Sequence, residues 1–391
     1  MDHDDLAHAL KQRGCLPRDG GDGYSSRILL CGCGAHALAA VAAGGKGDGP
    51  IKLFGAALSW HMAAKRPEPL TFILGADPGG HWRNCLSAIQ MIKPDGVQIL
   101  VDFQPAPERL DRDLSSVSWV DAMLDPVRRR LPPSARGLME SAGIGAFAWY
   151  RSVTGQGWSG RLDGLQVCVL SNNDRRLIFG VGRPGAKGDE SKARAQFLRL
   201  ARADAGVFGA IDESGHAVLD ASEIVRAVAI LEALAKSNIA LRGSAEHRLE
   251  AKVLRREVKL RTASGPLDVV VADQPFQFPA RWWPDGRPRY VDVIARQGAV
   301  PWVVELKTND SQGEGYRDGI VQAALYRQYV LHSPGLDRWF EHQQLNRLAC
   351  RAALVVPPLR GPQALELRAD HRAVAAHLGV EFIEEAAAAG S

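Results

Sequence analysis

Two apolar segments joined by a short turn carry charged residues where buried strands normally carry valine or leucine. They form "VDVIARQGAVPWVVELK", which runs from Val291 to Lys307. Apolar runs on both sides of a glycine-containing turn predict a β-hairpin. One face of this hairpin has to accommodate Asp292, Glu305 and Lys307. The chain is therefore expected to contain a sheet with two carboxylates and an ammonium group on one face.

The spacing predicts that the three charged side chains share one face of the sheet. With the turn at Gln297-Gly298, Asp292 lies opposite Val303 and has Glu305 as its diagonal neighbour. Lys307 joins them because alternate residues of a strand point the same way. Neighbouring carboxylates raise each other's pKa unless a cation neutralises them, and Mg²⁺ prefers carboxylate oxygens together with water and phosphate. The pattern suits metal-assisted hydrolysis of a phosphodiester. Taken alone, it also fits a surface hairpin with an ion pair.

Two predicted helices beside the hairpin complete a longer pattern. The stretch "RGSAEHRLE" (242–250) opens a helix before the hairpin, and "QAALY" (322–326) lies in a helix after it. With the hairpin, these stretches resemble the RecB-like branch of the PD-(D/E)XK nuclease superfamily, over about residues 240–385. In order, the matching residues are Gly243 and His247, Asp292, Glu305 and Lys307, then Gln322 and Tyr326.

The resemblance implies a role for each matching residue. Asp292 and Glu305 would bind Mg²⁺ or Mn²⁺, and Lys307 would be the catalytic base or orient the attacking water. Gln322 and Tyr326, one helical turn apart and so on one helix face, would brace the site and the nucleic acid. The expected fold is α/β, with a restriction-endonuclease-like core of a mixed sheet flanked by helices.

The helix before the hairpin offers more than one metal ligand. The RecB-like branch places a histidine there, which would be His247. Many relatives outside that branch use a glutamate instead, and both Glu246 and Glu250 qualify. The match also departs from the family pattern at Tyr290, where these enzymes often carry glycine two residues before the aspartate. The choice between His247, Glu246 and Glu250 therefore stays open.

The remainder of the chain predicts a separate N-terminal domain. We expect residues 1–238 to form an α/β or α+β domain for regulation, targeting or oligomerisation, and residues 239–391 to form the nuclease domain. Hairpins are predicted around Asn172-Asn173-Asp174 and Glu213-Ser214-Gly215, and helices over 190–203 and 221–237. No internal repeat is visible in the sequence.

A glycine-rich stretch near the N-terminus indicates a second possibility. "RILLCGCGAHALAAV" contains a G-x-G-x-x-A pattern at Gly32, Gly34 and Ala37, as in a strand, turn and helix that bind a dinucleotide. The acidic residue expected at the end of the following strand is missing, because "IKLFGA" ends without one. Close helix–strand packing is the alternative interpretation.

Composition narrows the class of protein without naming a function. The net charge of +4 indicates no strongly basic surface, and hydrophobic residues make up 46% of the 391 residues, as in globular proteins with a core. Six cysteines without a C-x-x-C pair favour a reducing, cytoplasmic location in a bacterium. No segment has the length and apolarity of a membrane span.

These observations together predict a metal-dependent deoxyribonuclease, with RNA not excluded as substrate. Defence against foreign DNA or DNA repair would suit such an enzyme. No G-x-x-x-x-G-K-[ST] loop is present, so a motor or sensor would be a separate subunit, and a homo-oligomer is possible. The alternatives are a catalytically inactive nucleic-acid-binding protein with the same fold, and a nucleotide-dependent enzyme acting through the N-terminal domain.

Overall fold

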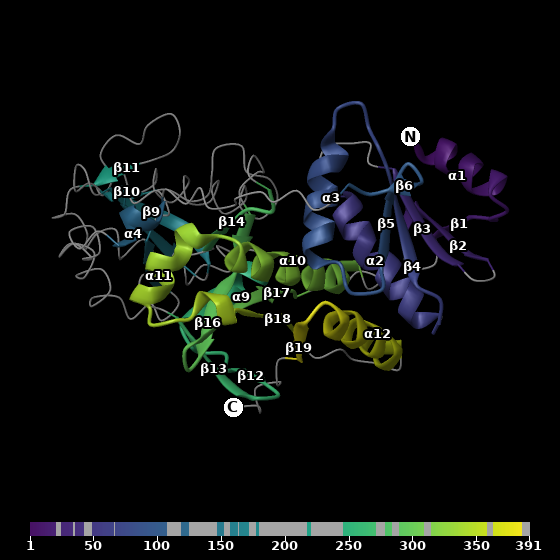
Figure 1. Cartoon of the computed structure of the whole chain (residues 1–391). Helices are drawn as coiled ribbons and strands as arrows, with labels where there is room; N and C mark the ends of the chain where they lie inside the picture. The colour runs from purple at the N-terminus through teal and green to yellow at the C-terminus, as the bar shows by residue number, and fades with distance from the viewer. Residues whose placement is uncertain are drawn as a thin grey trace, which may run out of the picture.

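The computed structural model describes residues 1–20, 25–33, 36–42, 49–65, 67–107, 119–124, 147–151, 157–162, 164–171, 177–179, 217–219, 245–270, 278–283, 289–308, 314–357 and 363–384. Within them the chain is an α/β protein with two six-stranded mixed sheets flanked by helices (Figure 1). A five-stranded antiparallel sheet and a two-stranded ribbon complete the described strands. The predicted fold class is confirmed.

The N-terminal sheet has its strands in chain order across the sheet. They are β1 (Arg18–Gly20), β2 (Ser25–Cys33), β3 (His36–Ala42), β4 (Leu70–Gly75), β5 (Gln98–Val101) and β6 (Gln104–Pro105). Strands β1, β2 and β3 pair with one another in antiparallel orientation, and β3, β4 and β5 pair in parallel orientation. Strand β6 pairs antiparallel with β5. Its helices are α1 (His3–Gln12), α2 (Gly49–Ala63) and α3 (His81–Ile92).

The glycine-rich stretch forms a hairpin, so the predicted strand, turn and helix of a dinucleotide site is wrong. Strands β2 and β3 pair antiparallel, with Gly32 opposite Ala37. Side chains of β3 alternate between two apolar layers: Ala39 and Val41 pack with α2 and α3, and Ala40 packs with α1. A strand buried on both faces is continuously apolar and cannot be told from a buried helix by sequence.

The middle of the chain contributes the antiparallel sheet. Its order is β11 (Ala217–Leu219), β10 (Leu177–Phe179), β9 (Leu165–Ser171), β8 (Gly157–Leu162) and β7 (Phe147–Arg151). The pairing of β9 with β10 confirms the hairpin predicted around residue 173, and a short helix, α4 (Trp119–Leu124), precedes the sheet. The helices predicted over 190–203 and 221–237, the turn at 213–215 and the boundary at residue 238 lie outside the described residues. The division into two domains stays a prediction.

The C-terminal sheet contains the predicted hairpin, with a predicted helix before it and another after it. Its strands are β12 (Leu260–Thr262), β13 (Gly265–Val269), β16 (Val293–Gln297), β17 (Val300–Leu306), β18 (Arg351–Val356) and β19 (Val380–Glu384). Strands β12, β13, β16 and β17 pair with one another in antiparallel orientation, and β17, β18 and β19 pair in parallel orientation. The helices around it are α9 (Ala245–Leu254), α10 (Glu314–Leu331), α11 (Asp337–His342) and α12 (Gln363–His377), and β14 (Phe278–Ala280) with β15 (Arg289–Val291) forms the ribbon.

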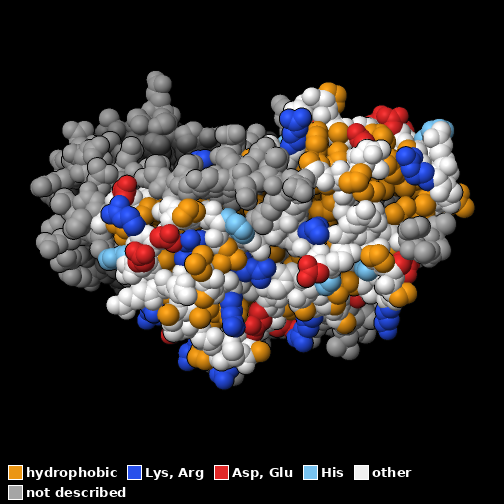
Figure 2. Space-filling model, viewed as in Figure 1, with side chains coloured by type: hydrophobic (Ala, Val, Ile, Leu, Met, Phe, Trp, Pro, Cys, Tyr) orange, Lys and Arg blue, Asp and Glu red, His pale blue; other side chains and the backbone are white. Residues whose placement is uncertain are grey.

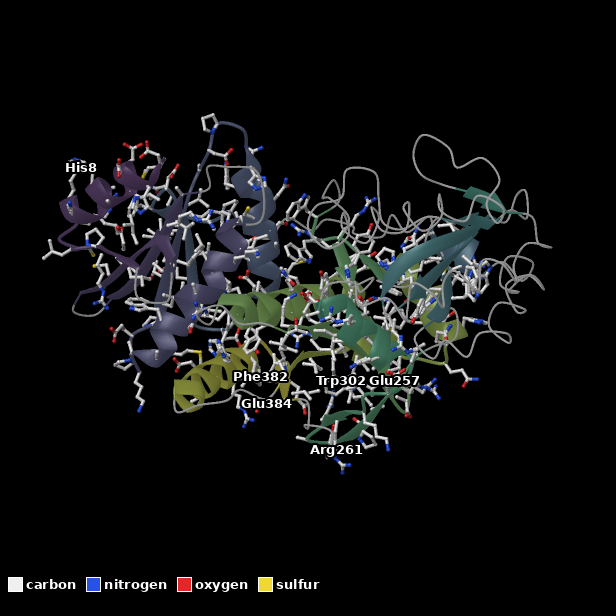
Figure 3. The ribbon with its side chains drawn as sticks, turned by 180° about the vertical axis from the view of Figure 1, so that it is seen from behind. His8, Glu257, Arg261, Trp302, Phe382 and Glu384 are labelled. Carbon is white, nitrogen blue, oxygen red and sulfur yellow. The ribbon has the colours of Figure 1, made fainter. Side chains whose placement is uncertain are left out.

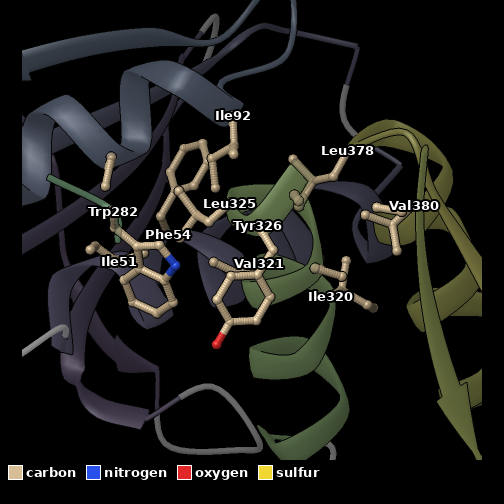
Figure 4. Packing of buried hydrophobic residues seen from close by; sticks show 14 of the residues in the cluster. Ile51, Phe54, Ile92, Trp282, Ile320, Val321, Leu325, Tyr326, Leu378 and Val380 are labelled. Atoms are coloured by element: carbon tan, nitrogen blue, oxygen red, sulfur yellow. The ribbon is translucent and has the colours of Figure 1, made fainter. Parts of the chain in front are cut away.

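The two six-stranded sheets share one apolar core through their helices. Figure 4 shows Ile51 and Phe54 of α2 and Ile92 of α3 beside Val321 and Leu325 of α10. A Cβ atom on Gly55 would lie 2.7 Å from Val321 Cγ2, so α2 and α10 approach more closely than a larger residue allows. The Lys52 amine also pairs with Asp318 at 2.7 Å. The helix layers therefore pack directly against each other.

None of the helices in the described part of the chain is both long enough and apolar enough to cross a membrane.

Candidate metal centre

The hairpin predicted from the sequence exists, but its turn lies one residue further along the chain. Val293 pairs with Val304 and Gln297 pairs with Val300, so Gly298 and Ala299 form the turn. Gly298 has a φ of 60°, which a two-residue turn with glycine at its first position accommodates. Continuing this register sets Asp292 opposite Glu305, not opposite Val303 as predicted. The correction brings the two carboxylates closer than the diagonal arrangement would.

Asp292 is held at the end of the hairpin by a backbone hydrogen bond. It directly precedes β16, and its Oδ2 accepts a hydrogen bond of 2.8 Å from the Leu306 backbone N–H. Asp292 and Glu305 are 7% and 3% exposed. Both carboxylates are thus fixed in a nearly dry environment at the carboxyl end of β17.

Lys307 connects the hairpin to helix α9. Its amine donates hydrogen bonds to Glu305 Oε1 at 2.7 Å and to Glu246 Oε1 at 2.8 Å. Glu246 is in the first turn of α9, so the helix start faces the end of β17. A single ammonium group therefore lies between carboxylates from two elements that are far apart in sequence.

Burial and mutual repulsion shift the pKa values of these acids upward. Burial raises the pKa of Asp292 well above its ordinary value, and the neighbouring Glu305 adds to this shift. Burial also raises the pKa of Glu305 to about 7, although the Lys307 ammonium opposes the rise. Burial alone would lower the pKa of Lys307, but Glu305, Asp292 and Glu246 raise it above its ordinary value. Lys307 is therefore charged at neutral pH. Its single positive charge does not offset the effect of burial on Asp292 and Glu305, so the pKa values of both carboxyl groups stay raised.

The helix residue that joins the two hairpin acids is Glu246. One carboxylate oxygen from each of Glu246, Asp292 and Glu305 lies within 4.8 Å of the other two. His247, the ligand implied by the RecB-like branch, is half-buried and does not belong to this group. Glu250 is fully buried one turn further along α9, close to Tyr150, whose pKa burial raises to about 12 with a smaller contribution from Glu250. The arrangement favours the glutamate alternative, and the role of each residue toward a metal stays a prediction.

Helix α10 packs against the acidic cluster through Tyr326 and Gly319. Tyr326 is buried, and its pKa is raised well above the usual range by burial and then by the charges of Glu305 and Asp292. Its phenol is therefore close to both acids, and it is hydrogen-bonded to the backbone of Tyr290. Gln322, one turn earlier, is half-buried. The predicted pair thus lies on the helix that covers the acidic end of the hairpin.

Sequence reasoning missed Gly319, which permits that close approach. A Cβ atom there would lie 3.0 Å from Lys307 Cγ and 2.7 Å from Leu354 Cδ1. A larger residue would force the Leu354 and Lys307 side chains, or α10 itself, to shift. A glycine inside a helix costs about 1 kcal/mol of stability relative to alanine. A glycine within the predicted helix was therefore the sequence feature that could have indicated a close packing contact.

The residues present fit a divalent cation. Three carboxylates face one ammonium group, an excess of two negative charges when all are ionised. Glu305 Oε2 is buried and has no hydrogen-bond partner in the described structure, and a buried acceptor of this kind is normally paired. Hard divalent ions prefer such oxygen ligands. The cluster could hold a metal ion of this class, and the donor set does not distinguish Mg²⁺ from Mn²⁺.

The charged side chains on the visible surface do not form a patch of one sign. Figure 2 shows Lys and Arg side chains scattered over one face, with Asp and Glu side chains between them. A nucleic-acid surface on this face would therefore be local rather than continuous.

Comparison of the chain with protein-family models, with curated proteins and with solved structures finds no significant match. The fold and the acidic cluster define the class: an α/β protein with a buried carboxylate site suited to a metal ion.

Proposed function

We propose that the chain is a metal-dependent nuclease that hydrolyses phosphodiester bonds of DNA. The observation that carries the proposal is the convergence of Glu246, Asp292, Glu305 and Lys307 at the end of one hairpin. Mg²⁺ or Mn²⁺ is the proposed cofactor, held by the three carboxylates. The resemblance of the surrounding pattern to PD-(D/E)XK nucleases supports this choice, because that pattern uses an acidic pair and a lysine on adjacent strands.

The chain's own residues would position and polarise the reactants. When bound at the three carboxylates, a divalent ion would supply Lewis-acid polarisation of the phosphate and activation of the attacking water. Asp292, restrained by the Leu306 N–H, keeps one carboxylate oxygen in place without side-chain reorganisation. The Lys307 ammonium, held against Glu305, would orient the attacking water or stabilise charge that develops on the phosphate. Tyr326 would close the floor of the site against bulk water.

The biological setting is proposed on the resemblance alone. Defence against foreign DNA or DNA repair in a bacterial cytoplasm would suit a nuclease with an additional domain. A separate motor or sensor subunit is part of the same proposal, and a homo-oligomer is the alternative assembly.

The deciding experiment incubates the purified protein with labelled linear duplex, circular duplex, single-stranded DNA and RNA. Each substrate is tested with Mg²⁺, with Mn²⁺ and with chelator. We expect cleavage of DNA that requires the metal and is lost in Asp292→Asn, which keeps the size of the side chain and removes its charge. Binding of DNA without cleavage under every condition would support the inactive binding protein instead. Cleavage that persists in chelator or in Asp292→Asn would contradict the proposed site.

A further inference from the structure

The N-terminal sheet repeats the chain path of the C-terminal sheet. The first follows the order α1–β1–β2–β3–α2–β4–α3–β5, and the second follows α9–β13–β16–β17–α10–β18–α12–β19. In each, the corresponding strands are neighbours in the same order. The first three pair antiparallel and the last three pair parallel. Strands β6 and β12 and the insertions around α11 and β14–β15 are additions to this common path.

Corresponding helices cover corresponding faces of the sheet in the two units. Helix α1 packs through Leu6 and Leu10 on the layer containing Leu29 and Ala40. Helix α9 likewise packs on the layer of its own hairpin that contains Val304. The connecting helices α2 and α3 in one unit, and α10 and α12 in the other, cover the opposite face. His8 on α1 and Glu257, just after α9, lie far apart in Figure 3, which agrees with α1 and α9 as the outer layers.

The two units meet as the halves of a two-fold dimer do. Helix α2 packs against α10, its counterpart. Helix α3 packs against α10, and the matching contact, α2 against α12, is also made. In an interface with two-fold symmetry each contact between unlike elements occurs twice in this way. Figure 1 shows α2 and α10 side by side between the two sheets, and Figure 4 shows Phe54 of α2 near Val321 of α10.

The N-terminal unit carries no acids at the positions of Asp292 and Glu305, although the first turn of α1 holds Asp4 and Asp5 as the first turn of α9 holds Glu246. Glu305 is the penultimate residue of β17 and faces the connecting helices, and its counterpart in β3 is Val41. Asp292 lies opposite Glu305, and Ile28 lies opposite Val41. Both Ile28 and Val41 are buried in the core on the same side. The residue two positions after Val41 in the sequence is Ala43, where the other unit has Lys307.

We infer that the N-terminal unit is a metal-free second copy of the fold that takes the place of a partner subunit. The chain is then a pseudo-dimer with a single metal centre, and it cuts one strand of a duplex at each encounter. Cutting both strands together requires two centres related by a two-fold axis like that of the duplex. The strand-cutting part of this inference rests on the proposed nuclease function, whereas the metal count does not.

The metal count is tested by titrating the full chain with Mn²⁺ under calorimetric detection. We expect Asp292→Asn to lose all specific Mn²⁺ binding, with heats falling to those of dilution. Ile28→Val, at the matching position of the N-terminal unit, should leave the binding stoichiometry unchanged. Two Mn²⁺ ions bound per parent chain, or undiminished Mn²⁺ affinity in Asp292→Asn, would overturn the inference, because either result would reveal a second centre.

Strand cutting is tested by following supercoiled plasmid on a gel with the chain at several concentrations. We expect open-circular DNA to accumulate before linear DNA, at a rate proportional to enzyme concentration, from a monomer of 42.3 kDa. Linear DNA as the first product, or a rate that rises with the square of enzyme concentration, would overturn the single-centre inference. Absence of any cleavage would refute the proposed function, and the Mn²⁺ titration would then decide the second-copy inference on its own.

Discussion

The Lys307 amine donates a hydrogen bond of 2.8 Å to Glu246, a residue 61 positions earlier in the chain. This contact joins the first turn of α9 to the end of β17, and the same amine also contacts Glu305. The lysine is therefore a basic group that contacts two of the three carboxylates of the cluster. Its replacement can distinguish the proposed catalytic step from DNA binding.

Replacing Lys307 by alanine should impair catalysis far more than binding. In the proposed reaction the ammonium would act on the water or on developing charge, so its contribution would be largest in the transition state. We expect DNA cleavage to fall by at least about 100-fold, and DNA affinity at fixed salt to change only about threefold because one phosphate contact is lost. Single-turnover cleavage and filter binding on the same preparations measure the two quantities. Near-normal cleavage by Lys307→Ala would assign the activity to another site.

The helix ligand can be identified with two neighbouring substitutions. Glu246→Gln removes a carboxylate from the cluster and should weaken Mn²⁺ binding by about tenfold or more, within the range for lost metal ligation partners. His247→Gln, one residue further and outside the cluster, is the matched control and should leave Mn²⁺ affinity within about twofold of the parent protein. The reverse outcome in calorimetric titration would restore the histidine of the RecB-like branch.

The pKa of Glu305 predicts how stability depends on pH without metal. Its folded-state pKa, about 7, lies above the ordinary value because of burial, so the folded state binds the proton more tightly than the unfolded state does. Stability from this group is complete below the ordinary pKa and is lost as pH rises through about 7. Glu305→Gln removes the ionisation, so it should raise the melting temperature at pH 8 by at least about 2 °C and have little effect at pH 5. Thermal unfolding in chelator at both pH values measures this, and an equal change at both would contradict it.

The close contact between α2 and α10 can be tested by a mutant cycle. Gly55→Ala places a methyl group 2.7 Å from Val321 Cγ2, and overpacking of this kind typically costs about 1–3 kcal/mol. Val321→Ala removes the obstructing methyl groups, so the double variant should be more stable than the sum of the two single changes predicts. Additive effects in denaturant unfolding would show that the two helices do not meet as described.

Much of the C-terminal unit was predictable because its information is local. Alternation along β17 depends only on side-chain direction in a strand, so Glu305 and Lys307 share a face wherever the hairpin packs. A turn with an even number of residues then places Asp292 on that face too. The helices over 245–254 and 314–331 follow from periodic apolar positions in the same way. The acidic residues of the hairpin could therefore be predicted from the sequence to lie together.

Other features depended on contacts between distant segments. The turn at Gly298-Ala299 rather than Gln297-Gly298 set Asp292 against Glu305, and the packing of α9 on the sheet turned Glu246 rather than His247 toward it. Adjacent helical residues differ by about 100° in direction, so a small rotation of the helix decides between them. No local pattern records that rotation.

The sequence by itself determined the two strands of the C-terminal hairpin, the helices beside it and the charges that these segments bear. Only the tertiary structure decided that β2 and β3 form a hairpin, and that the two sheets follow one path although their sequences show no repeat. The physical reason is that apolar burial depends on the pattern and volume of side chains more than on their identity. Ile28 and Val41 can therefore occupy positions where Asp292 and Glu305 stand in the other unit, and the path of the chain is kept while the chemistry is not.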